Sequence, residues 1–300
     1  MKKEATMNRA ELLRLLSAGA AAALLPGAAC AGQSSSSTAT PMSPLSLKGN
    51  IRHAVCRWCY GNIPLEALCD AAKDMGLQGI DLLNPPEWKT ALDRGLAVSM
   101  SFGSELGIPK GFNDPANHPK LRRDYEELIP KAAAMGVQNI ICFSGNRNGI
   151  SDEAGLEHCA RGLDPLVKLA RQHNVVLVME LLNSKVDHAD YQCDKTPWGA
   201  ALAEKLGSPH FKLLYDIYHM QIMEGDVIAT IRKYHPYIAH YHTGGVPGRH
   251  EIDETQELYY PAIMRAIVET GHKGFVAQEF IPSRQPVLDS LKQGVQICDV

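Results

Sequence analysis

The chain carries no excess of basic charge. Lys and Arg total 30 against 33 Asp and Glu, which gives a formal net charge of -3 over 300 residues. Because no broad basic surface is available to hold a phosphate backbone, nucleic acid is not an expected partner. A small molecule is the partner that this composition favours.

Long apolar runs are also missing. The run at 15–25 is about half the length that a helix needs to cross a bilayer, so it does not predict a permanent span. Basic residues precede it and the small residues Ala29 and Ala31 follow it, which is the pattern of an export signal over residues 1–31. We therefore predict an exported, periplasmic protein. Cys30 also fits lipidation, which would be the only membrane attachment.

Cysteine is too scattered for a disulfide framework. If Cys30 is removed or lipidated, seven of the eight remain, an odd number. Four lie within apolar strand or helix patterns, namely Cys56, Cys69, Cys142 and Cys159. Cys56 and Cys59 have the spacing of a redox pair, but they lie inside a predicted strand rather than at a helix start. We expect packed thiols.

One domain follows the signal. Residues 32–50 are rich in Ser, Thr and Pro, which predicts a solvated linker, and residues 51–300 remain for a TIM-barrel catalytic domain. Short apolar runs alternate there with longer helical segments, the pattern of βα units. The predicted strands are 51–59, 79–83, 97–102, 139–144, 175–182, 211–217, 238–243 and 274–280.

This pattern predicts an α/β fold of the (β/α)8 type. Eight units in about 250 residues match a closed barrel better than an open doubly wound sheet. No Gly-rich dinucleotide loop follows the first predicted strand. Several predicted helices end at a Gly that leads into the next strand, and Pro130 predicts a kink or break in its helix.

Acidic and imidazole groups stand at the ends of four consecutive predicted strands. Glu180, Asp216, His242 and Glu279 end the fifth, sixth, seventh and eighth. Active sites of barrels lie at the carboxyl ends of the strands, and neighbouring strands are about 4.8 Å apart, so these side chains can converge on one ion. Three carboxylates and one imidazole favour Mn²⁺ or Mg²⁺, with Co²⁺ as an alternative.

Further candidates surround this cluster. His219 lies three residues past Asp216, His240 alternates with His242 on one strand, and Arg249 follows on a loop where it could clamp a carboxylate or ketose oxygen. Asn183 lies on the loop after Glu180. We predict these four as substrate-binding residues, with a packing or supporting role as an alternative for His240.

Six short motifs resemble those of the hydroxypyruvate isomerase family, within the xylose isomerase-like barrel superfamily. They are Cys56-Arg-Trp-Cys-Tyr-Gly61, Met75-Gly-Leu-Gln-Gly-Ile-Asp81, Met179-Glu-Leu-Leu-Asn183, Tyr215-Asp-Ile-Tyr-His-Met-Gln221, His240-Tyr-His-Thr-Gly-Gly-Val-Pro-Gly-Arg249 and Ala277-Gln-Glu-Phe280. The resemblance implies a metal on the four strand-end residues, with His219 and Arg249 near the substrate. It also implies, by analogy, a homo-oligomer.

The expected activity is a metal-dependent isomerisation through an enediolate, with hydroxypyruvate converted to tartronate semialdehyde. Glu180 and Glu279 are the expected proton carriers. Hydroxypyruvate isomerases often carry Gln where this chain has His242, whereas similar ketose 3-epimerases carry His. An exported ketose 3-epimerase or keto-glycoside epimerase or lyase is therefore an alternative, and a non-catalytic exported sugar-binding protein is another. A nuclease similar to endonuclease IV would need more metal ligands and a basic surface.

Overall fold

A computed structural model describes residues 45–300 of the chain. Eight parallel strands form one sheet with the order β3-β2-β1-β8-β7-β6-β5-β4. The strands are β1 (Arg52–Cys56), β2 (Gly79–Asp81), β3 (Ala97–Val98), β4 (Asn139–Cys142), β5 (Val176–Glu180), β6 (Phe211–Asp216), β7 (Ile238–Thr243) and β8 (Phe275–Gln278). All eight predicted strands are present, and most of them are shorter than predicted.

The two ends of this strand order meet. Ser101, just after β3, forms a parallel bridge with Ile140 of β4. The Ser101 amide donates to the Asn139 carbonyl at 2.9 Å, and the Ile141 amide donates to the Ser101 carbonyl at 3.0 Å. The predicted (β/α)8 barrel is therefore confirmed.

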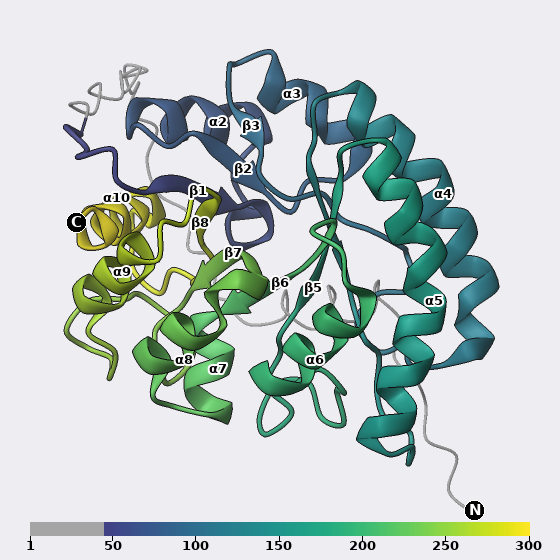
Figure 1. Cartoon of the computed structure of the whole chain (residues 1–300). Helices are drawn as coiled ribbons and strands as arrows, with labels where there is room; N and C mark the ends of the chain where they lie inside the picture. The colour runs from purple at the N-terminus through teal and green to yellow at the C-terminus, as the bar shows by residue number, and fades with distance from the viewer. Residues whose placement is uncertain (1–44) are drawn as a thin grey trace, which may run out of the picture. The chain divides into compact units, whose positions relative to one another are not determined.

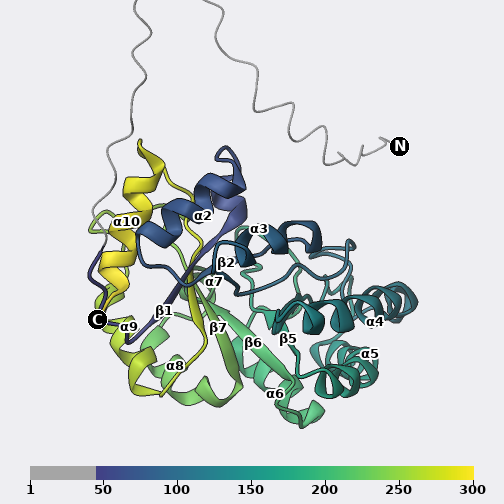
Figure 2. The same ribbon diagram turned by 90° about the horizontal axis from the view of Figure 1, so that it is seen from above.

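Helices surround the strands (Figure 1). They are α2 (Leu65–Asp74), α3 (Trp88–Leu92), α4 (His118–Ala134), α5 (Asp152–Gln172), α6 (Thr196–Leu206), α7 (Ile217–Met223), α8 (Val227–Tyr234), α9 (Tyr260–Glu269) and α10 (Val287–Cys298). The two ends of the described chain lie side by side, since the Lys48 amide donates to Asp299 at 3.0 Å and Asn50 Nδ2 donates to the Val300 carbonyl at 2.8 Å (Figure 2). No helix of residues 45–300 is long and apolar enough to span a membrane.

Side chains alternate along each strand between two apolar cores, one between the strands and the helices and one inside the barrel. One face of each strand packs against the helices, and the other fills the barrel interior with residues such as Cys56, Val178, Leu214 and Ala277. Because side chains alternate along a strand, the residue two positions after an interior residue also points inward. Glu180, Asp216 and Glu279 lie two positions after interior residues, which explains why these acids face the same space.

Left-handed glycines close the helices as expected. Gly76, Gly136, Gly207 and Gly271 have φ of 82°, 74°, 57° and 78°, and each leads from a helix toward the next strand. A side chain at these positions would be strained whatever space surrounded it. The prediction of αβ turns from the repeated Gly is confirmed.

One local prediction was wrong, and of the kink or break predicted at Pro130 the break is absent. Residues 57–60 form a 3-10 helix rather than the end of the first strand, and the Arg57 side chain donates to the Tyr60 carbonyl at 2.7 Å across this turn. Helix α4 continues through Pro130 without a break, because Leu128, Ile129 and Ala132 are buried on either side of the proline. Packing of that face outweighs the lost backbone hydrogen bond.

All seven cysteines of the described chain are free, including Cys56 and Cys59, so no disulfide joins that pair.

The predicted linker and signal are described only in part. Leu45 and Leu47, within the predicted linker, pack against the core. The export signal at 1–31, the lipidation of Cys30 and most of the linker at 32–50 lie outside the described residues and stay predictions.

The loop after β7 is tied to the loop after β8 by one buried carboxylate. Glu251 accepts hydrogen bonds from the Ser283 amide at 2.9 Å, the Ser283 hydroxyl at 2.7 Å, the Arg284 amide at 3.2 Å and the Ser290 hydroxyl at 2.8 Å. Although burial opposes the charge, these donors lower the pKa of Glu251 to about 2. This carboxylate therefore fixes the loop that carries Arg249.

Replacing Glu251 by Ala is expected to lower the free energy of unfolding by about 2 kcal/mol at pH 7. Because the pKa of Glu251 is lower in the folded than in the unfolded chain, its contribution is present above the ordinary Glu pKa of about 4.3 and is lost as pH falls toward 2. Thermal unfolding at pH 7 and at pH 3 measures this difference. Replacement of the exposed Glu254 on the same loop is the control, and an equal effect of both variants would contradict the prediction.

Candidate metal centre and active site

Four strands deliver four polar side chains to one place. Glu180 is the last residue of β5, Asp216 the last residue of β6, His242 lies in β7, and Glu279 directly follows β8. The register places Asp216 beside His242 and His242 beside Ala277, so the three strands end at the same level. Each of the four side chains is at least nine-tenths buried.

The His242 ring lies at the centre of the three carboxylates. Its Nδ1 is 2.6 Å from Glu279 Oε2, 3.3 Å from Glu180 Oε1 and 3.9 Å from Asp216 Oδ2. The structure therefore brings together the four residues that the sequence predicts as metal ligands, with one ligand atom of each within 4.8 Å of all the others.

This donor set fits a divalent cation. Although three carboxylates surround it, the buried Nδ1 of His242 satisfies hydrogen-bond geometry with no group in residues 45–300. Three buried carboxylates at this separation repel one another unless a cation lies between them. Oxygen donors with one imidazole suit a hard or borderline ion such as Mg²⁺ or Mn²⁺.

The two glutamates have opposite pKa shifts. Burial raises the pKa of Glu180, and the neighbouring Glu279 adds to this effect. Burial also disfavours the charge of Glu279, but His242 and Arg249 outweigh it and hold its pKa well below the usual range. Burial raises the pKa of Asp216 to about 7 despite the nearby Arg249. The site thus holds two carboxyls with raised pKa values, Glu180 and Asp216, and one, Glu279, that stays ionised.

Arg249 closes one side of the cluster. Its Nη2 donates to Asp216 Oδ2 at 2.9 Å and also to Glu279, and its Nη1 lies 2.7 Å from His219 Nε2. Asn183 Nδ2 contacts the other ring nitrogen of His219 at 2.7 Å. Burial and the charge of Arg249 lower the pKa of His219 well below its ordinary value, which keeps this ring neutral. The predicted substrate residues Arg249, His219 and Asn183 are therefore connected by contacts, with Arg249 and His219 in the pocket lining and Asn183 behind them.

A small pocket opens onto this cluster. Its volume is about 190 Å³. The lining consists of Trp58, Leu82, Phe102, Ile108, Ile141, Phe143, Glu180, Leu182, His188, His219, Arg249 and Glu279. The lining combines charged and polar residues with aliphatic and aromatic ones, and Arg249 is the only Lys or Arg in it. A ligand with one oxygen-rich end fits this arrangement.

Trp58 is a site residue that the sequence did not single out. It lies in the short 3-10 helix after β1, and its Nε1 donates to Glu279 Oε1 at 2.7 Å. The Arg249 guanidinium lies 5.5 Å from the Trp58 ring centre. With 41% of its surface exposed, Trp58 borders both the buried acid and solvent. Its place at the end of a barrel strand was the signal that could have identified it.

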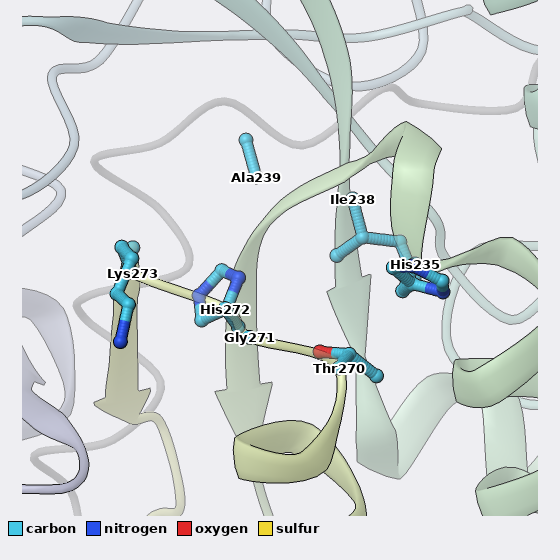
Figure 3. A pocket seen from close by; sticks show the side chains of 8 residues that line it. His235, Ile238, Ala239, Thr270, Gly271, His272 and Lys273 are labelled. Atoms are coloured by element: carbon cyan, nitrogen blue, oxygen red, sulfur yellow. The ribbon is translucent and has the colours of Figure 1, made fainter.

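A larger cavity lies at the other ends of the strands. Its volume is about 350 Å³, and it is bordered by Ile238 at the start of β7 and by His272 and Lys273 just before β8 (Figure 3). No carboxylate lines it. Since it offers no acid and base pair, the smaller pocket is the candidate active site.

His240 and Asp81 lie beneath the predicted ligands. His240 Nε2 is 2.9 Å from Asp81 Oδ2, and His242 Nε2 is 3.0 Å from Asp81 Oδ1. The structure therefore places His240 behind His242, and it is absent from the pocket lining. The sequence left open whether His240 binds substrate or supports the site, and its contact with Asp81 matches the supporting role. Asp81 was missed as a site residue, although an acid at the end of a buried strand is itself a signal.

The closed barrel and its cluster of strand-end acids define a class of α/β-barrel enzymes, the sugar isomerases and epimerases. A family model described as "Xylose isomerase-like TIM barrel" matches residues 69–297. The chain belongs to this family, and its curated relatives place it with the hydroxypyruvate isomerase-like isomerases.

Two curated relatives and one solved structure show the extent of the similarity. A human protein named putative hydroxypyruvate isomerase is 28% identical over 75% of this chain and 77% of its own length. The 2-oxo-tetronate isomerase of Cupriavidus necator is 32% identical over 73% of this chain and 87% of its own. The structure of a 3-keto-D-glucoside 4-epimerase from E. coli has a TM-score of 0.69 at 15% identity, covers 82% of this chain and 98% of that one, and shows the shared fold.

Proposed function

We propose that the protein is a metal-dependent isomerase that moves a proton next to a carbonyl, with hydroxypyruvate or a closely similar 2-keto compound as substrate. The observation that supports this most directly is the pair of glutamates that line the pocket, each within 3.3 Å of His242 Nδ1. The relatives named as hydroxypyruvate and 2-oxo-tetronate isomerases support the same reaction class.

The proposed metal ligands are Glu180, Asp216, His242 and Glu279. When bound, Mn²⁺ or Mg²⁺ supplies Lewis-acid polarisation of a carbonyl oxygen and stabilises the negative charge of an enediolate. Arg249 is the one Lys or Arg of the pocket lining, so it is the group whose charge can attract a substrate carboxylate or ketose oxygen, with one Nη1 hydrogen left over from its contacts to His219, Asp216 and Glu279.

The glutamates divide the proton transfer between them. Glu279 stays ionised, as a base must be, and accepts a hydrogen bond from Trp58, so we assign to it the abstraction of the α-proton. Glu180 lines the same pocket, and we assign to it the return of a proton at the adjacent carbon.

A ketose 3-epimerase or a keto-glycoside epimerase or lyase is the second candidate. It would use the same first proton abstraction, and His242 stands where the resemblance gives His to ketose 3-epimerases. The apolar residues of the lining, Leu82, Phe102, Ile141 and Phe143, can contact the carbon skeleton of a ketose, which hydroxypyruvate lacks in large part. A non-catalytic sugar-binding protein would have no use for the two glutamates with opposite pKa shifts.

Product analysis separates the candidates. The Mg²⁺-loaded protein is incubated with hydroxypyruvate, with a panel of ketoses and with 3-keto-glucosides, and products are identified by chromatography and NMR. Formation of tartronate semialdehyde supports the isomerase, and a 3-epimer or a cleaved glycoside supports the second candidate. If no compound is converted by a protein that holds metal and binds a sugar, catalysis is contradicted in favour of the binding protein.

Replacing Arg249 by Lys is expected to lower kcat/KM by about 10-fold to 100-fold. Lys keeps the charge but cannot form the planar fork that contacts Asp216, Glu279 and a substrate oxygen together. Steady-state kinetics at saturating metal measures the effect. The matched control is Arg232 to Lys on the surface, where the guanidinium pairs only with Glu269, and an equal loss in both variants would contradict the role of Arg249.

We also propose, from the signal pattern at 1–31, that the protein acts after export to the periplasm. An exported isomerase would meet keto sugars taken up by the cell before they enter central metabolism. Fractionation of cells that express the full chain tests this proposal. Retention of uncleaved protein in the cytoplasm would contradict it.

A further inference from the structure

Asp81 is a buried acid that the proposed proton transfer does not use. It ends β2 inside the barrel with no exposed surface. Its Oδ1 accepts a hydrogen bond from His242 Nε2 at 3.0 Å. Its Oδ2 accepts from the Ser99 hydroxyl at 2.5 Å and lies 2.9 Å from His240 Nε2. Both oxygens of one carboxylate are therefore engaged, and each has a different histidine beside it.

The contacts of the His242 ring define which nitrogen carries the proton. An ionised carboxylate can only accept hydrogen bonds, so the nitrogen that faces Asp81 must carry the hydrogen. The opposite nitrogen, Nδ1, faces Glu180 and Glu279 and satisfies hydrogen-bond geometry with none of the described residues. With a metal bound, the ring would be neutral with its hydrogen on Nε2, and the Nδ1 lone pair would be directed into the cluster of carboxylates.

We propose that Asp81 is the positioning residue of the metal centre: through His242 Nε2 it fixes the ring orientation and tautomer in which Nδ1 is the metal ligand. Ser99 holds Asp81 in turn by a hydrogen bond to the oxygen that does not face His242, and His240 Nε2 lies 2.9 Å from the same oxygen. This proposal rests on the metal site of the proposed function. It adds a layer of three residues, from β2, β7 and the end of β3, beneath the four ligands.

The strand order explains how this layer forms. β2 and β7 are not neighbours in the sheet, since β1 and β8 lie between them. The contacts between Asp81 and the two histidines therefore cross the barrel interior rather than follow the sheet. Cys56 of β1 fills the space between them, with its Sγ 3.6 Å from Asp81 Oδ1 and 3.7 Å from His242 Nε2. Such a cross-barrel contact restrains ring rotation in a way that neighbouring strands alone do not.

A merely structural role for Asp81 makes a different prediction. If Asp81 served only as a buried partner of His240, its replacement would change stability but not the affinity for metal. If it positions His242, replacement lowers metal affinity, because outer partners of a ligand histidine typically contribute 10-fold to 100-fold. Metal affinity measured on folded protein therefore separates the two roles without any assay of activity.

The test compares two variants and one control by calorimetric titration with Mn²⁺. Asp81→Leu removes both acceptors while it keeps the branched side-chain shape, and about 10-fold to 100-fold weaker binding is expected. Asp81→Asn retains one neutral acceptor, and a smaller loss of at least about 3-fold is expected. The control, Thr243→Val, removes a buried hydrogen bond to Gln278 at 2.9 Å on the same strand without a contact to the His242 ring, and unchanged affinity is expected.

A second measurement follows the tautomer directly. In Mg²⁺-loaded protein with ¹⁵N-labelled histidine, the proposal predicts a protonated Nε2 and an unprotonated Nδ1 for the ring whose signals are lost in His242→Gln, and Asp81→Asn shifts both of these ring ¹⁵N signals. If Asp81→Leu does not fold, Asp81→Asn decides the question by the same two measurements.

Folded variants that bind Mn²⁺ as tightly as the wild type overturn the proposal, and so does a wild type that binds no Mn²⁺. A wild type that binds Mn²⁺ but converts no substrate overturns the proposed function alone. In that case the ratio of variant to wild-type affinity still decides the role of Asp81.

Discussion

Replacing Glu279 by Gln lowers turnover by about 10²-fold or more at saturating metal while the fold is retained. The Gln amide keeps an oxygen that can accept a hydrogen bond from Trp58 Nε1, as Glu279 Oε1 does at 2.7 Å. It cannot accept the α-proton, and loss of a general base typically costs 10²-fold to 10⁴-fold. The expected signature is a fall in kcat rather than a rise in KM.

Because Glu279 is also a proposed metal ligand, the variant is assayed at several Mn²⁺ concentrations until the rate no longer rises. The matched control is Glu257 to Gln, an exposed acid on the loop after β7 that accepts only from Gln221 at 3.0 Å. Its turnover is expected to equal that of the wild type. Near-normal turnover of the Glu279 variant would remove the proton role from this residue.

Removal of the metal abolishes activity, and Mn²⁺ or Mg²⁺ restores it. Glu180, Asp216 and Glu279 lie within 3.9 Å of one imidazole nitrogen, so without a cation their charges are opposed only by Arg249 and His242. The chelated protein is assayed before and after addition of each ion, and chelator presaturated with Mg²⁺ is the control. Full activity after complete removal of metal would contradict the proposed mechanism.

The same experiment has a readout in stability. A ligand that binds only the folded chain stabilises it, by about 2.7 kcal/mol at 100 times its dissociation constant. The melting temperature of the chelated protein is therefore expected to rise with added Mn²⁺ until the site is full. The rise should be absent in a variant that lacks both Asp216 and His242, the two ligands to which we assign no proton transfer.

Sequence periodicity was sufficient to predict the barrel. Apolar runs bounded by glycines with positive φ, such as Gly76 and Gly207, mark strands that are buried on both faces. Once eight such units are counted, the position of the active site follows, because side chains at strand ends share one rim. Glu180, Asp216 and His242 were therefore found from position alone, before any contact was known.

The contacts of the site were harder to predict. Asp81 meets His240 and His242 across the barrel, and no spacing in the sequence encodes a contact between strands that are not neighbours. Arg249 is expected from the sequence to face a substrate, yet its guanidinium also binds Asp216 and Glu279. The sequence does not predict these ion pairs, because the charge balance of a buried cluster depends on the positions of all its members. Trp58 was overlooked because its turn was taken for the end of a strand.

The central claim, proton abstraction next to a carbonyl, is tested most directly by proton NMR in D₂O. The Mg²⁺-loaded protein is mixed with hydroxypyruvate and a panel of ketoses, with the Glu279 to Gln variant as the blank. We expect enzyme-dependent loss of the α-proton signal of at least one compound, and the compound that exchanges identifies the substrate class. If a protein shown to hold metal exchanges no α-proton of any compound, the enediolate mechanism is contradicted.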